Sequence, residues 1–98
     1  SMTQPVDDGF YARADAHIQL SNQQISEAAG RGKVSASMMF ATARFNTWVS
    51  ACEYRSGEHM AQSKEQLIEY FLKQYRYMLE ENMDDYIQDF DKYMHGGE

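Results

Sequence analysis

The sequence predicts an all-α protein, a three-helix bundle with a long C-terminal helix that is either continuous or broken near Asn82. Two observations predict this class. Apolar residues recur at steps of three and four along most of the chain, which is the spacing of amphipathic helices. Valine and isoleucine are scarce and Pro5 is the one proline, whereas a β-rich chain needs more β-branched and turn residues.

The length of 98 residues predicts a single helical domain, which we expect to span residues 9–95. Short polar ends at residues 1–8 and 96–98 are expected to be flexible. Aromatic residues make up 13% of the chain and supply apolar area that argues against disorder.

The first helix is expected to begin near Gly9, with Asp7 or Asp8 as its N-cap. Its apolar positions continue at helical spacing to Ala28, so it is expected to run for about five turns. The following segment, Gly30-Arg31-Gly32, predicts a helix end, because glycine readily adopts the left-handed conformation that closes a helix.

The second helix is expected to begin near Ser35 and to end at Ser56-Gly57. It carries an apolar stripe at alternating steps of three and four. Two of the aromatic residues of this stripe, Phe45 and Trp48, are expected to be buried in the core, and Cys52 is expected to pack there as a small apolar residue. The stripe consists of Met38, Ala41, Phe45, Trp48 and Cys52.

The third helix is expected to begin after Ser63, which forms a capping-box pattern with Gln66. Nine of the thirteen residues in 67–79 are apolar or aromatic, and the three charged residues there, together with Glu80, fall on one narrow stripe. A helix with so narrow a polar stripe is expected to be covered on most sides, by the other helices or by another subunit. The polar stripe consists of Glu69, Lys73, Arg76 and Glu80.

The net charge of −6 is unevenly distributed along the chain. Residues 30–64 hold five basic and two acidic residues (+3), and residues 76–98 hold two basic and seven acidic residues (−5). An acidic total disfavours nucleic acid and anionic membranes as partners. The single cysteine fits a reducing compartment, and neither a secretory leader nor an apolar run of about 20 residues is seen. These features predict a cytoplasmic protein.

No catalytic or metal-binding motif is recognisable. His17, His59 and His95 lie in three different segments and match no zinc-binding pattern, so we expect no metal and no cofactor. Asp89 and Asp91 resemble the start of a calcium loop, but Tyr93 stands where the third ligand is expected. We therefore expect a protein that is not an enzyme.

The candidate binding residues are Arg44 and Asn46, which lie in the middle of the second helix among aromatic residues. A guanidinium near the core needs a partner. Arg44 is expected either to form an ion pair with the acidic last helix or to act as a polar anchor in a small pocket. Tyr54, Tyr70 and Tyr77 lie off the main apolar stripes and are candidates for an exposed aromatic interface.

Four stretches carry a resemblance to a known family: FYARADAHI at 10–18, GKVSASMMF at 32–40, ARFNTWV at 43–49 and YRYMLEENMDDY at 75–86. The sequence resembles the short proteobacterial proteins grouped as domain of unknown function 3144. The resemblance covers nearly the whole chain. It implies a bacterial, cytoplasmic, stand-alone helical protein, and it implies no activity and no site residues.

The predicted function is a non-catalytic helical module for protein–protein interaction that forms homo-oligomers, because two partner helices would not fully cover residues 67–79. The alternative is a helical protein that binds a small ligand or an anion through Arg44, Asn46 and their neighbours. A third hypothesis is an enzyme whose reactive groups the helices bring together from distant positions. A fourth, an acidic mimic of nucleic acid, would use residues 80–91.

Overall fold

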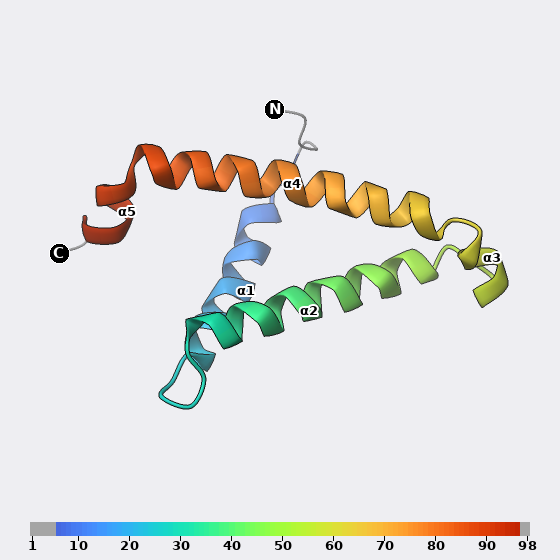
Figure 1. Ribbon diagram of the computed structural model, residues 1–98, viewed down its shortest axis with the longest axis horizontal. Coiled ribbons are helices and arrows are strands. Elements are labelled where there is room, and N and C mark those ends of the chain that lie inside the picture. Colours follow the sequence, from blue (N-terminus) through green and yellow to red (C-terminus); the bar gives the residue numbers. More distant parts are fainter. Residues whose placement is uncertain (1–5, 97–98) are drawn as a thin grey trace. The chain divides into compact units, whose positions relative to one another are not determined.

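The computed structural model describes residues 6–96 and confirms the all-α class, since every regular element in this range is a helix. The helices are α1 (Phe10–Gln24), α2 (Arg31–Ala51), α3 (Gly57–Ala61), α4 (Lys64–Gln88) and α5 (Phe90–His95), as Figure 1 shows. Two of these, α3 and α5, are short helices in addition to the three predicted. The contacts divide the described chain into two compact units, Val6–Met60 and a unit that begins at Ala61. The prediction of one domain over residues 9–95 stays a prediction.

Asp7 organises the start of α1, although Gly9 rather than an aspartate occupies the N-cap position. The Asp7 carboxylate accepts a hydrogen bond from the Gly9 backbone N–H at 3.0 Å. The Arg13 guanidinium donates to both carboxylate oxygens, at 2.9 and 2.8 Å. The hydrogen bond from Arg13 lowers the pKa of Asp7 below its usual value. Asp7 and Asp8 are thus part of a turn that leads into α1, and residues 1–5 and 97–98 of the predicted flexible ends lie outside the described range.

The first helix ends at Gln24, four residues before Ala28, the last apolar position predicted for it. Ile25 has an extended backbone, and Ser26 closes a tight loop with Ala29 instead of continuing the helix. The Ser26 side chain accepts the Ala29 N–H at 3.2 Å, and this competition for backbone donors is what makes serine a weak helix former. Gly30 then serves as the N-cap of α2, with ψ of 178°, so the prediction of a left-handed glycine ending the first helix is wrong.

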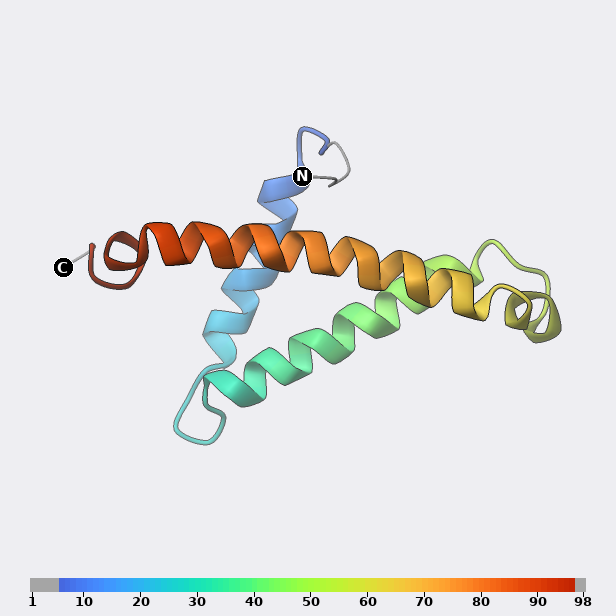
Figure 2. The same ribbon diagram turned by 45° about the horizontal axis from the view of Figure 1, so that its top comes forward.

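The second helix begins at Arg31, so the prediction of Ser35 as its N-cap is also wrong. It packs against α1 near its own start. Val34 is 6% exposed, and the Ser21 hydroxyl donates to the Met38 sulfur at 3.2 Å. From this contact the two helices diverge, as both Figure 1 and Figure 2 show. Val34 is consequently the one buried apolar residue among residues 6–96.

The divergence of α1 and α2 corrects the prediction that Phe45 and Trp48 lie in the core. Both side chains are 62% exposed, and their rings contact each other with centroids 5.7 Å apart. They occupy the predicted apolar stripe, but on the half of α2 that extends beyond its contact with α1. Cys52, further along the same stripe, is exposed as well.

The helix α3 occupies a segment that was predicted to be only a helix end. The Ser56 side-chain hydroxyl accepts a hydrogen bond from the His59 backbone N–H at 3.0 Å. The His59 Nδ1 accepts one from the Arg55 backbone N–H at 3.3 Å. The arrangement resembles a capping box with histidine in the place of glutamate, but His59 accepts from Arg55 and not from the capping residue Ser56. The Tyr54 ring packs edge-on against the His59 ring, with centroids 4.9 Å apart.

The fourth helix runs without a break from Lys64 to Gln88, so it is continuous through Asn82. The Asn82 side-chain amide donates to the Met78 carbonyl at 2.7 Å, a bond that asparagine can make within a helix. Ser63 is the N-cap, as predicted, but its side chain makes no capping hydrogen bond. The break in the C-terminal helix instead falls at Asp89, whose φ of −114° and ψ of 39° end α4.

The short helix α5 folds against the last turns of α4 through one tyrosine. The Tyr93 hydroxyl donates to the Asp85 carboxylate at 2.6 Å. Its ring stacks on that of Tyr86 with centroids 4.2 Å apart and an angle of 11° between the ring planes. The hydrogen bond to Asp85 raises the pKa of Tyr93 above its usual value of 10.0.

We expect alkaline pH to release α5 from α4. Because the pKa of Tyr93 is raised in the folded state, its stabilising contribution is complete below about pH 10 and is lost as pH rises through the folded pKa. The Tyr93→Phe variant keeps the stacked ring and lacks the donor, so it should show weaker α5 docking that no longer depends on this titration. The effect is measured by NMR across pH. The observables are the ring carbon chemical shifts and the NOE contacts between the Tyr86 ring and the ring at position 93. An identical alkaline loss of these NOE contacts in Tyr93→Phe would contradict the assignment.

Candidate interaction surfaces

The two polar candidates of α2 lie on different sides of that helix. Residues two positions apart in an α-helix are separated by about 200° around its axis. Arg44 is exposed, and Asn46 is half-buried. Arg44 forms no ion pair within residues 6–96. The ion pair between Arg44 and the acidic last helix stays a prediction.

The three candidate tyrosines are distributed over both units. Tyr54 lies after α2 in the Val6–Met60 unit, half-buried against His59. Tyr70 and Tyr77 lie seven residues apart on one side of α4, with Tyr70 49% exposed and Tyr77 half-buried. The Tyr70 ring packs edge-on against Phe71 with centroids 5.2 Å apart. Of the three, Tyr70 presents the largest exposed aromatic surface.

The titratable side chains of the described chain do not gather into a metal site. No three His, Cys, Asp or Glu side chains within residues 6–96 form a group that could hold a metal ion. In the same range, no helix combines the length and the apolar character that crossing a membrane requires.

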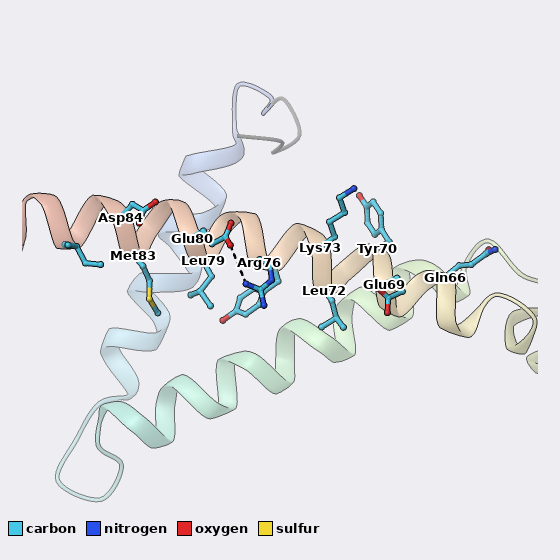
Figure 3. Close-up of a pocket in the computed structure, with 12 residues that line it drawn as sticks. Gln66, Glu69, Tyr70, Leu72, Lys73, Arg76, Leu79, Glu80, Met83 and Asp84 are labelled. Carbon is cyan, nitrogen blue, oxygen red and sulfur yellow. Dashed lines mark hydrogen bonds and ion pairs between the residues drawn. The ribbon is translucent and has the colours of Figure 1, made fainter.

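The largest exposed apolar feature of α4 is a stripe that we call the α4 face. Its members recur at steps of three and four, so they lie on one side of the helix. Figure 3 shows Leu72, Leu79 and Met83 projecting from the same side of α4, and Lys73 and Tyr70 projecting elsewhere. Among the described residues of its own unit, only α5 packs on this stripe, at Tyr86. The α4 face consists of Leu72, Tyr75, Leu79, Met83 and Tyr86, which are 38–59% exposed.

A hollow along α4 has the polar stripe on one side and the α4 face on the other (Figure 3). Arg76 and Glu80 form an ion pair at 3.4 Å at its centre. All twelve lining residues belong to α4, so the hollow has a wall on one side only. Small-ligand sites enclose most of the ligand surface, which one convex helix cannot do. The hollow is therefore better suited to an elongated partner, such as another helix, than to a small molecule.

A second exposed apolar surface, the α2 face, lies on the half of α2 that extends beyond α1. It consists of Phe45, Trp48 and Val49, with Val49 45% exposed. Exposed aromatic clusters of this kind are typical of protein interfaces. The sequence signal for this surface was present as the apolar stripe of the second helix. That stripe was interpreted as core because the divergence of α1 from α2 leaves no mark in the sequence.

Comparison with known proteins places the chain in a family. The model of the family described as "Protein of unknown function (DUF3144)" matches residues 10–87. The NMR structure of the protein NB7890A from a Shewanella species is 40% identical to this chain, with a TM-score of 0.73, and the match covers 92% of this chain and 95% of that chain. A search of curated proteins found no match. The chain belongs to the DUF3144 family of helical proteins of unknown function.

Proposed function

We propose that this chain is a non-catalytic helical module that acts through protein–protein interaction and self-associates. The observation that carries the proposal is the pair of exposed apolar surfaces, the α2 face and the α4 face. Together they present aromatic and aliphatic side chains along two helices, and Trp48 alone is 62% exposed. Burial of apolar surface is the main favourable term in most protein association, at about 25 cal/mol per Å².

The proposal also places the protein in the cytoplasm of a bacterium. The single cysteine, which is exposed, fits a compartment where thiols stay reduced. The similar solved structure comes from a Shewanella species, which supports a bacterial source.

The experiment is a determination of mass in solution over a wide concentration range. Size-exclusion chromatography with light scattering, and sedimentation velocity, should be run from about 1 μM to about 1 mM, a range that detects dissociation constants of the same order. We expect a mass of at least twice the chain's 11.4 kDa at the upper end. A mass of 11.4 kDa at every concentration would contradict self-association.

A further inference from the structure

We propose that the occupant of the α4 face is the α2 face of a second copy of the chain, and that the two helices pair in antiparallel orientation. This inference rests on the proposed self-association and goes further by assigning its surfaces. Charge and symmetry favour this partner.

The charges of the two helices are complementary. The basic residues of α2 are Arg31, Lys33 and Arg44, and α2 contains no acidic residue, so it carries +3. The helix α4 carries three basic and six acidic residues, which gives −3. Two copies of α4 would therefore repel each other overall, whereas α2 and α4 attract. Complementary charge at an interface raises the association rate and suppresses wrong pairings.

The distribution of charge along each helix sets the orientation. Arg31 and Lys33 lie in the first turn of α2, and four acidic residues lie in the second half of α4. Antiparallel pairing brings these regions together, and it also places the helix dipoles in the favourable opposed arrangement. In this orientation Phe45 lies opposite the first half of the α4 face, near Leu72. The acidic residues in question are Glu80, Glu81, Asp84 and Asp85.

A two-fold dimer satisfies both surfaces at once, because each copy supplies one α2 face and one α4 face. Both faces are exposed in the structure of the single chain, with Phe45 at 62% and Leu72 at 59%.

The test is disulfide cross-linking between copies that carry one cysteine each. Cys52 is first replaced by Ser, so that no native thiol remains. One copy then carries Phe45→Cys, and the other, made longer by a tag, carries Leu72→Cys. After mixing, re-equilibration and mild oxidation, we expect a cross-linked heterodimer of distinct mass. Each single-cysteine copy alone is the control, with yields expected below about a tenth of the mixed sample because a disulfide needs Cα atoms within about 7 Å.

A second α4 position tests the orientation. Met83→Cys lies about 16 Å further along α4 than Leu72→Cys, so antiparallel pairing should give at least about tenfold less cross-linking with Phe45→Cys. Stronger cross-linking at Met83→Cys than at Leu72→Cys would overturn the antiparallel arrangement.

The outcomes separate this inference from the proposed function. If the mixed copies form a dimer by light scattering but no Phe45–Leu72 cross-link, the surface assignment is wrong and self-association stands. If the chain is monomeric at every concentration, both fall. In that case a single chain that carries both Phe45→Cys and Leu72→Cys is oxidised. An internal disulfide in this chain would show that its own Val6–Met60 unit occupies the α4 face.

Discussion

Replacing Leu79 by Asp is expected to weaken self-association at least a hundredfold while leaving α4 helical. Leu79 lies at the centre of the α4 face and is 38% exposed in the single chain. Association would bury the rest of its side chain, and a buried leucine contributes about 1.5–3 kcal/mol. A carboxylate at this position would have to lose its hydration without a partner, which adds a penalty of several kcal/mol. In a two-fold dimer both effects occur twice.

The matched control for this variant is Gln66→Asp, which introduces the same charge on the polar side of the same helix. We expect Gln66→Asp to associate as the unmodified chain does. Sedimentation velocity gives the dissociation constants, and circular dichroism checks that the helix content of both variants is unchanged. Equal association of the Leu79→Asp and Gln66→Asp variants would show that the α4 face is not an interface.

Replacing Val34 by Asp is expected to unfold the packed pair of α1 and α2. Val34 is 6% exposed and is the one buried apolar side chain among the described residues. An isolated buried charge costs several kcal/mol, and the total stability of a chain of this size is about 5–10 kcal/mol. The loss is therefore comparable to the whole stability of the unit. A cooperative thermal transition followed by circular dichroism should disappear or fall by tens of degrees, at about 4–8 °C per kcal/mol.

The neighbouring exposed residue supplies the control. Ser35→Asp places the same charge one position along α2, where the side chain faces water. Exposed substitutions of this kind usually change stability by less than about 0.5 kcal/mol. A Val34→Asp variant that melts within a few degrees of Ser35→Asp would show that this contact does not hold α1 and α2 together.

Trp48 gives a contrasting expectation, because the structure changes what its substitution should do. If Trp48 were a core residue, its truncation to alanine would lower the free energy of unfolding by roughly 3–5 kcal/mol. Trp48 is 62% exposed, so most of its surface contributes nothing to the stability of the single chain. Truncation of Trp48 should therefore affect self-association more than the unfolding of the Val6–Met60 unit.

The helical class and most of each long helix were readable from the sequence, because both depend on local periodicity and end signals. The steps of three and four predicted that α2 and α4 are helices, and Ser63 was correctly predicted as the N-cap of α4. The predicted bounds of α2 were wrong, since it runs from Arg31 to Ala51 and not from Ser35 to Ser56. The competition of side chains for backbone hydrogen bonds was harder to predict. Ser26 ends α1 early through a bond to Ala29, and Asp89 rather than Asn82 ends α4, since Asn82 finds a carbonyl within the helix.

The apolar stripes were determined by the sequence alone, but which of them is buried was decided only by tertiary structure. The pattern of α2 is the same at Val34 and at Trp48, yet one is buried and the other exposed. The difference arises because α1 touches α2 near its start and then diverges, as the loop at residues 25–30 directs. Periodicity reports that a side chain avoids water, and only the position of the neighbouring helices determines what covers it.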